Sequence, residues 1–503
     1  MASILTNTSA FTALANLRSI NSNLVDVQNQ ISTGKKISNA RDNAAIFSVS
    51  KTLESDVAGF SAISDSLNVG DATLAIGRQA AETVSDILTE LKGNIVAAQE
   101  ENVDRTKIQA DIDAKVDQIQ SIVGAASFNG LSLVQGTDDV NILGSLSRDG
   151  SGNVTASDIT VARRDLTTQA GSLGTGAGLT DLSANVTASS LTLSADAVRD
   201  DGAGTAADIT VGDDADQDSF SFAIDGTTVS FAVGELDAVA ATAAGQIADA
   251  INAAQIDGIT VTANADTLEF ASTRQFEDVF VDGTVTGGNS SLTADVTLGE
   301  RAESFTLANV TVNEGDGYQV SLGGGVVATY VAGSNETIED VANGLALAVD
   351  SFNDAELTTQ VVNDGTNFIL KVDNTGADRT ATIVANNDAN ENAVVTGGLA
   401  GLDSIDVTTN ENADSALKNI DILLNNSLDA AASFGSDQSR IALQDEFVTS
   451  LIDSLRTGIG ALVDADLEAA SARLQALQVQ QQLGVQSLSI ANQAPQSILS
   501  LFR

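Results

Sequence analysis

The sequence predicts an α+β multidomain fold, because apolar residues recur at helical spacing at both ends of the 503-residue chain and alternate at strand spacing in its middle. The charge divides at the same places. Residues 151–404 hold 7 basic and 38 acidic residues, whereas residues 1–150 hold 11 and 18, and residues 405–503 hold 5 and 12. Amphipathic helices bury their apolar stripes, so the two ends must pair across the insert. We expect an elongated, folded-back rod with helical coiled-coil and bundle domains and inserted β-rich outer domains.

The first predicted helix extends to about residue 31 and carries a coiled-coil seam. Its apolar residues recur at alternating spacings of three and four: Leu17, Ile20, Leu24, Val27 and Ile31. The stretch ISTGKKISNARDNAA, residues 31–45, then interrupts the helical pattern. Gly34 and Asn39 permit a non-helical path there, and Ser38 or Asn39 can cap the helix that follows.

Helical periodicity returns on both sides of the insert. Two further helices are expected at about 44–100 and 103–123, and the C-terminal part is helical over about 417–462 and again beyond 463. The last helix has a narrow apolar seam that is interrupted by several glutamines and by Gly484. Such a stripe is too polar for a lone stable helix and indicates a crowded assembly of helices. Its seam residues are Leu467, Leu474, Leu477 and Leu488.

The middle of the chain contains two copies of a hairpin–helix–hairpin module, at about 205–290 and 300–400. In DSFSFAIDGTTVSFAVGE, residues 218–235, two alternating runs flank Asp225-Gly226, a preferred pair for a tight turn. A short amphipathic helix and a second hairpin follow, and the same order returns later in the chain. We interpret each copy as a small α+β domain inserted between the helical ends.

The composition removes most enzyme classes. The chain has no His and no Cys, which supply the commonest general base, the nucleophilic thiol and the usual zinc ligands. A net charge of −45 argues against nucleic acid or an anionic membrane as a partner. MASILTNTSAFTALANLRSI lacks the basic and apolar regions of a secretory signal, and no apolar run suits a membrane span. We expect no enzymatic activity, and no catalytic, metal or cofactor site.

Three stretches at the two ends carry a specific resemblance. They are ISTGKKISNARDNAA, then SIVGAASFNGLSLVQG at 121–136, and finally ALVDADLEAASARLQALQVQQQLGVQSLSIANQAPQSILSLFR at 461–503. In this order and at these ends they resemble the bacterial flagellin family, over about 1–165 and 405–503. The resemblance implies a structural subunit that polymerises through its terminal helices into the flagellar filament used for swimming. The related hook–filament junction protein is the alternative, although NQAPQSILSLFR and the complete N-terminal signature favour flagellin.

The resemblance also implies a domain organisation. Residues 1–44 and 455–503 would form an inner coiled-coil polymerisation domain, and residues 45–165 and 405–454 a helical bundle core with a β-hairpin. Residues 166–299 and 300–404 would be two outer β-rich domains. The break in the first helix would be a spoke between coiled coil and bundle, with charged groups available to acidic groups of neighbouring subunits. The spoke residues are Gly34, Lys35, Lys36, Arg41 and Asp42.

Several partners and a location follow from the same resemblance. We expect a homo-polymer of many copies, a flagellar export chaperone that covers the C-terminal helix at about 463–503, and contacts with hook-associated and cap proteins. The subunit would be extracellular, in the flagellum, and exported through the flagellar secretion channel without a cleaved signal peptide. Some flagellins resemble metallopeptidases in an outer domain, but a chain without His cannot carry that H-E-x-x-H motif. An adhesive role of the acidic middle stays open beside the structural role.

One stretch differs from the family at a receptor motif. Many flagellins are detected by a Toll-like receptor through a motif of the form Leu-Gln-Arg-Val-Arg-Glu-Leu. The matching stretch has Glu90 where the family has its first Arg and Gly93 where it has Glu. A charge reversal replaces an attraction with a repulsion, so we expect weak or no activation of this receptor. The stretch comprises Leu88, Thr89, Glu90, Leu91, Lys92 and Gly93.

Overall fold

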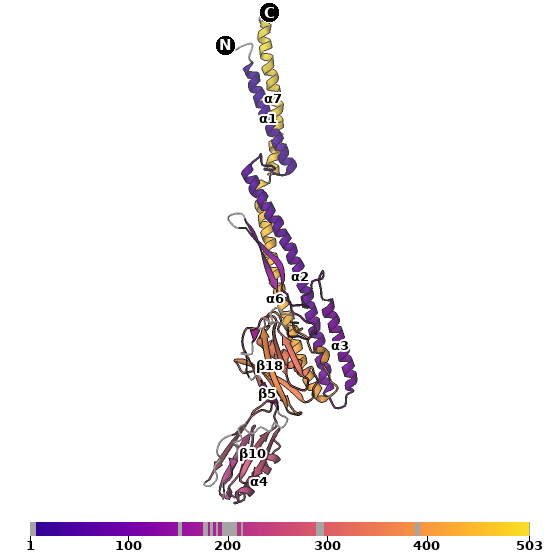
Figure 1. The fold of residues 1–503 in the computed structure, drawn as a ribbon. Coiled ribbons are helices and arrows are strands. Elements are labelled where there is room, and N and C mark those ends of the chain that lie inside the picture. The colour runs from indigo at the N-terminus through magenta and orange to yellow at the C-terminus, as the bar shows by residue number, and fades with distance from the viewer. Residues whose placement is uncertain are drawn as a thin grey trace. The chain divides into compact units, whose positions relative to one another are not determined.

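The computed structural model describes residues 7–148, 153–174, 180–181, 185–187, 190–193, 209–212, 215–287, 296–387 and 393–501. The chain forms two compact units. The first comprises Met1–Ala72, Asn141–Thr160 and Asp437–Arg503, and the second comprises Thr73–Val140 and Val161–Ser436. The α+β prediction is confirmed, because helices form both ends of the chain and strands fill its middle (Figure 1).

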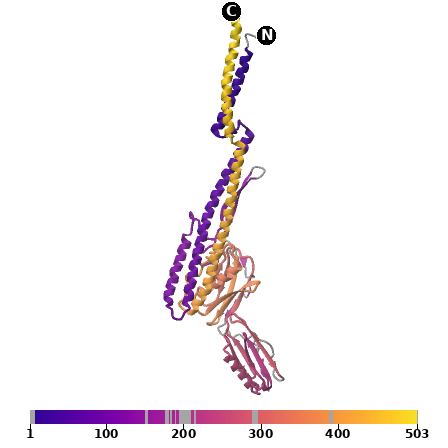
Figure 2. The same cartoon turned by 180° about the vertical axis from the view of Figure 1, so that it is seen from behind.

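The first unit is built from the two ends of the chain. Helix α1 (Thr8–Thr33) lies side by side with α7 (Leu467–Leu501), as both views show (Figures 1 and 2). The long helices α2 (Ala44–Ala98) and α6 (Asn410–Val463) each run through both units. The predicted helical tracts are therefore confirmed, and the chain folds back so that its first and last helices pair.

A β-hairpin packs on the part of α2 that belongs to the first unit. It consists of β1 (Val140–Arg148) and β2 (Val154–Val161). Gly70 allows the close approach, since a Cβ there would lie 2.6 Å from the Ile142 Cδ1. An ion pair of 2.5 Å between the Arg148 Nη2 and the Asp56 Oδ1 fixes the same hairpin to the helix.

The second unit contains a third N-terminal helix, which follows α2 in the chain. Helix α3 (Arg105–Ala125) buries Ile112, Val116, Ile119 and Val123, which lie at helical spacing on one face. Its Gln109 side chain donates to the Ile405 carbonyl and accepts from the Val407 amide, at 2.8 and 2.9 Å. No helix in the described ranges has a stretch that is both long and apolar enough to cross a membrane.

The predicted pair of hairpin–helix–hairpin modules is present. In the first, β11 (Val279–Thr286) pairs with β7 (Ser219–Ile224). In the second, β18 (Arg379–Asn387) pairs with β14 (Asp316–Ser321) in the same way. The two modules therefore have the same strand connectivity. Residues 205–208, 213–214 and 288–290 of the first predicted copy and residues 388–392 of the second lie outside the described residues. The first module contains β6 (Ile209–Thr210), β7 (Ser219–Ile224), β8 (Thr227–Phe231), α4 (Ala240–Ala253), β9 (Ile259–Asn264), β10 (Thr267–Ser272), β11 (Val279–Thr286) and β12 (Val296–Leu298).

Three short strands that precede the first module in the sequence belong to the two sheets of the second module. Strand β4 pairs with β13, while β3 and β5 pair with β18. Helix α5 begins with a capping box in which the Thr337 and Asp340 side chains accept from each other's backbone amides. The elements are β3 (Thr180–Asp181), β4 (Val186–Thr187), β5 (Ser190–Leu193), β13 (Glu303–Ala308), β14 (Asp316–Ser321), β15 (Val327–Val331), α5 (Ile338–Asp350), β16 (Leu357–Asn363), β17 (Asn367–Asn374) and β18 (Arg379–Asn387).

Each module has its own apolar core, which the alternating pattern of the strands supplies. In the first, Phe220 and Phe222 point inward from β7, and the ring of Phe222 lies 6.3 Å from that of Phe270. In the second, Phe305 and Tyr318 are fully buried beneath α5. The predicted turn at Asp225-Gly226 has positive φ angles of 49° and 73° at its two residues, as a type I′ turn requires.

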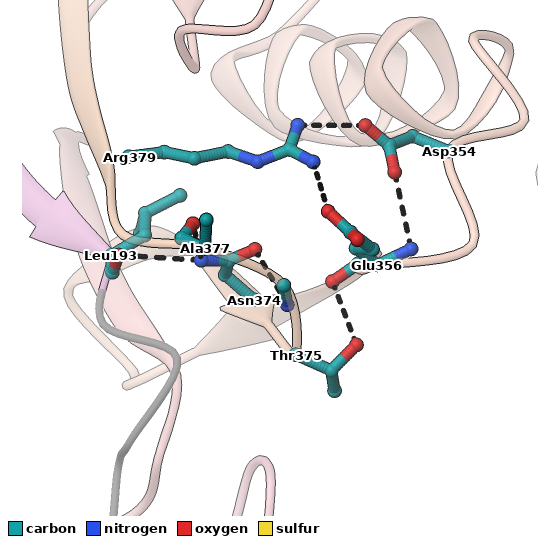
Figure 3. A network of polar contacts seen from close by, with 8 residues as sticks. Leu193, Asp354, Glu356, Asn374, Thr375, Ala377 and Arg379 are labelled. Atoms are coloured by element: carbon teal, nitrogen blue, oxygen red, sulfur yellow. Dashed lines mark hydrogen bonds and ion pairs between the residues drawn. The ribbon is translucent and has the colours of Figure 1, made fainter.

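A polar network fixes one end of the second module. The Arg379 guanidinium bridges Asp354 and Glu356 at 2.7 and 2.6 Å, and the Asn374 amide donates to the Leu193 and Ala377 carbonyls (Figure 3). The side chain of Arg379 is only 13% exposed. A paired arginine in this position ties the loop after α5 to the start of β18.

Candidate functional site

The paired ends of the chain carry the predicted seam. Val27 on α1 and Ala470 and Leu477 on α7 are buried at 2%, 7% and 6% exposure. Partly buried residues of both helices surround them: Ile20, Leu24, Ile31 and Leu474. The structure thus brings residues of the first and last helices into one apolar contact.

Three predicted seam residues lie outside this cluster. Leu17 is half-buried and faces Gly484, where a Cβ would lie 3.4 Å from its Cδ1. Leu488 is half-buried, and Leu467 is 50% exposed because it is the first residue of α7. Sequence reasoning missed Ala470 and the close approach at Gly484. Their helical spacing from Leu477 was a usable signal, but small residues do not stand out in an apolar pattern.

Polar contacts continue the pairing along the same helices. The Gln481 side chain donates to the Asn21 side chain at 2.7 Å, and the Asn7 amide donates to the Ala491 carbonyl at 2.9 Å. The glutamine-rich stretch of the last helix therefore supplies part of the contact between α1 and α7.

Much apolar surface remains open on this helix pair. The exposed fractions reach 66% for Phe11 and 63% for Ile490. Other large apolar side chains on the two helices are also exposed: Val25, Leu467, Val479, Leu483 and Val485. Surface of this kind marks a site of interaction with another protein chain.

The break after α1 lies against the break between α6 and α7. Gly34 ends α1 in the left-handed conformation, with a φ of 68°. This agrees with the prediction that Gly34 permits a non-helical path. The Lys36 amide donates to the Val463 carbonyl at 2.6 Å, and the Ala465 amide donates to the Gly34 carbonyl at 2.9 Å. Lys35 and Asp464 form an antiparallel bridge between the two segments.

Asp42 organises the turn that follows. Its carboxylate accepts from the backbone amides of Ser38 and Asn39 at 3.0 and 3.2 Å, and these bonds, that of Ser38 first, lower its pKa. The prediction that Ser38 or Asn39 caps the next helix is wrong. Asn43 caps α2 instead, since its side chain accepts from the Ala45 and Ile46 amides at 3.1 Å.

The cations of this segment have different environments. The Lys35 Nζ lies 3.8 Å from Glu54, whose pKa is lowered mainly by its hydrogen bond with Lys51 and also by Lys35. Lys36 and Arg41 form no ion pair with any residue of the described ranges. Their charges therefore remain available to groups outside this chain.

The predicted receptor stretch lies on α2 with two faces. Leu88 and Leu91 are fully buried, while Thr89, Glu90 and Gly93 are exposed. Two charged residues of the stretch form ion pairs with neighbouring helices of the same unit. Glu90 pairs with Lys115 on α3 at 2.5 Å, and the bond raises the pKa of that lysine. Lys92 pairs with Asp421 on α6 at 2.6 Å.

The helical ends match models of known protein families. Residues 4–139 match the bacterial flagellin N-terminal helical region, and residues 417–502 match the bacterial flagellin C-terminal helical region. Terminal helices of this kind define a structural subunit of the bacterial flagellum.

Relatives match along the entire chain. Flagellin A of Rhizobium meliloti is 31% identical over 512 residues, and Flagellin D of Rhizobium meliloti (strain 1021) is 31% identical over 510 residues, each with 100% of both chains covered. The chain belongs to the bacterial flagellin family. Among solved structures, the flagellar hook associated protein-3 of Legionella pneumophila matches with 11% identity and a TM-score of 0.32, covering 82% of this chain and 98% of that chain.

Replacing Leu477 or Leu24 with aspartate should abolish self-assembly. Losing a buried leucine costs about 2–5 kcal/mol, and a carboxylate in the seam adds a desolvation penalty. Sedimentation and electron microscopy of the purified variants would measure filament formation. Gln360→Asp, on an exposed position of β16 in the second module, is the control and should assemble. Normal filaments from Leu477→Asp would contradict the role of the seam.

Proposed function

We propose that this chain is a filament subunit of the bacterial flagellum and polymerises through α1 and α7. The main observation in support of polymerisation is the apolar surface that the α1–α7 pair leaves exposed. Phe11 and Ile490 are each more than half exposed there. One helix pair cannot cover such a surface by itself, whereas many copies stacked along their ends can. Residues 1–45 hold 4 basic and 2 acidic residues, and residues 454–503 hold 3 of each, so the two ends suit close packing. The acidic middle suits a surface that faces water.

The filament subunit is favoured over the hook–filament junction protein. Both alternatives share terminal helices, but the flagellin relatives align over the full chain, including the β-rich middle. Flagellin is a structural family, and the subunit belongs in the extracellular flagellum. We further assign residues 1–44 and 455–503 to the inner coiled coil, residues 45–165 and 405–454 to the bundle, and residues 166–299 and 300–404 to outer domains.

The proposed export route is passage through the flagellar secretion channel without a cleaved signal. The composition supports refolding outside the cell, because the chain has no Cys and one Pro. A chain without disulfides and with a single X–Pro bond avoids two slow steps of refolding. Hook-associated and cap proteins would meet the subunit at the two ends of the filament.

Polymerisation should protect the ends of the chain from protease. Isolated marginal helices do not persist in water, so residues 1–31 and 464–503 should be cleaved in dilute monomer while a core of about 45–450 resists. In assembled filaments both ends should be protected. Limited proteolysis followed by mass spectrometry, on monomer and on filament, would measure this. Equal resistance of the ends in both states would show that they do not fold on assembly.

The export chaperone should bind the last helix. A chaperone that masks α7 would cover the exposed Val479, Leu483 and Ile490 before export. Deleting residues 480–503 should therefore abolish binding, measured by calorimetry with the purified chaperone of the same organism. A truncation at the other end, removing residues 1–24, is the control and should leave binding unchanged. Unchanged affinity of the 480–503 deletion would refute the site.

The chain should activate the Toll-like receptor poorly. Glu90 presents a carboxylate that is 65% exposed where the family motif has a guanidinium, and the mismatch costs about 2–5 kcal/mol if that contact is buried in the complex. A reporter-cell assay with endotoxin-free monomer would show low potency. Glu90→Arg combined with Gly93→Glu raises the net charge by one and should recover part of the activity, and Glu100→Gln, an equal change of net charge on an exposed residue, should not. Full potency of the unchanged chain would overturn the assignment.

A further inference from the structure

The second unit contains a polar cavity. Its volume is about 710 Å³, within the usual range of small-molecule sites. The walls come from the connecting segment 163–166, from the loop before α5, and from one face of α6. These elements are anchored to each other, because the Gly398 amide donates to the Asp165 carbonyl at 2.9 Å and the Asn426 side chain donates to the Gly398 carbonyl at 2.8 Å.

Two arginines line the cavity, and the charge of Arg164 acts on Glu336, where it opposes the rise in the pKa of that carboxyl group. The Nε atoms of Arg163 and Arg164 are buried and make no hydrogen bond within the described residues, and neither guanidinium forms an ion pair there. A buried donor without an acceptor is costly, more so when it belongs to a charged group. Gly136, with φ 80°, leaves room beside Arg163, since a Cβ there would lie 3.0 Å from its Nη1.

Two neutral side chains on the other walls also make no hydrogen bond within the described residues. The Asn343 side chain on α5 and the Asn425 side chain on α6 line the cavity and make no hydrogen bond within the described part of the chain. Unpaired donors from the connecting segment, α5 and α6 therefore converge on one space. Guanidinium groups bind oxyanions in a fixed geometry, and carboxamides exchange hydrogen bonds with hydroxyl groups.

Carboxyl groups also line the cavity, and one of them, Glu336, lies close enough to Arg164 for their charges to interact. Glu336 accepts from the Tyr330 hydroxyl and the Gly333 amide at 2.8 and 2.9 Å, and burial raises its pKa to about 7. Asp165 accepts from the Gly136 and Thr167 amides, at 3.2 and 2.8 Å. The other carboxyl groups that line the cavity are Glu339, Asp340, Asp421 and Asp429; Asp340 is held by Thr337 and Asp421 by Lys92.

We propose that this cavity binds a small polyhydroxylated oxyanion, of the size of a monosaccharide acid or a monosaccharide phosphate. Arg163 and Arg164 take the oxyanion, and Asn343 and Asn425 take hydroxyl groups. All residues that line the cavity belong to the second unit, whereas α1 and α7 belong to the first.

Calorimetry on the full-length monomer, at a concentration below assembly, tests the site with four probes. Glucuronate and glucose 6-phosphate should bind, whereas neutral glucose and inorganic phosphate should bind at least about tenfold more weakly, because each lacks one part of the recognised chemistry. The two anionic sugars distinguish a carboxylate from a phosphate ligand. Equal binding of inorganic phosphate would identify an adventitious ion only and overturn the proposal, as would the absence of binding by both anionic sugars.

Variants separate the site from non-specific charge. Arg163→Gln with Arg164→Gln should weaken the anionic sugars by roughly tenfold or more. Arg456→Gln, an exposed arginine of the first unit, is the matched control and should bind normally. Filament formation and an unchanged thermal unfolding profile would show that the double variant folds. Equal affinities of the double variant and the control would contradict the assignment.

The pH dependence of glucuronate binding supplies an independent test. Protonated Glu336 is neutral, so lowering the pH from 8 to 6 removes a negative charge beside Arg164 and should tighten binding several-fold. Glucuronate keeps its own charge across this range. Glu336→Gln should bind tightly at both pH values. A pH response that persists unchanged in Glu336→Gln would show that another group controls the cavity.

Discussion

Helix α1 and helix α7 each have an apolar stripe that a single helix would leave in water. Each of the two helices covers the stripe of the other along their contact. Val27 meets Ala470 and Leu477 in this seam although they are separated by almost the whole chain. Closing the seam brings both ends of the sequence together and allows everything between them to be an insertion. The first module, β6–β12, and the second module, β13–β18 with β3–β5, each complete their own core, and neither core includes seam residues.

The sequence predicted the helices, the two modules and most of the seam because their patterns repeat. Ile20, Leu24 and Val27 recur at coiled-coil spacing, and each β-hairpin alternates apolar and polar residues around a turn such as Asp225-Gly226. A regular period spreads one signal over many residues, so single exceptions such as Leu467 do not hide it. The repeated order of hairpin, helix and hairpin was visible for the same reason.

The remaining features have no repeated pattern. The Lys36 amide pairs with the Val463 carbonyl, and a backbone hydrogen bond leaves no trace in side-chain types. Ser38, Asn39 and Asn43 are all good helix caps, and only the path of the chain decides that Asn43 has this role. The cavity beside Arg163 and Arg164 likewise depends on α5 and α6, which are distant in sequence. Tertiary contacts between non-periodic residues cannot be predicted from spacing.

A joint forms where the break after α1 lies against the break between α6 and α7, and it has a mechanical consequence. Around Gly34 and Val463 two segments of the chain leave the helical conformation side by side, and backbone amides and carbonyls hold them together. Helices are stiff rods, whereas short extended segments joined by main-chain hydrogen bonds yield more easily to bending and torsion. Elastic strain applied to this unit will concentrate at the joint and spare the apolar seam. Because the bonds there use main-chain atoms, side chains can vary around the joint without changing where the molecule is compliant.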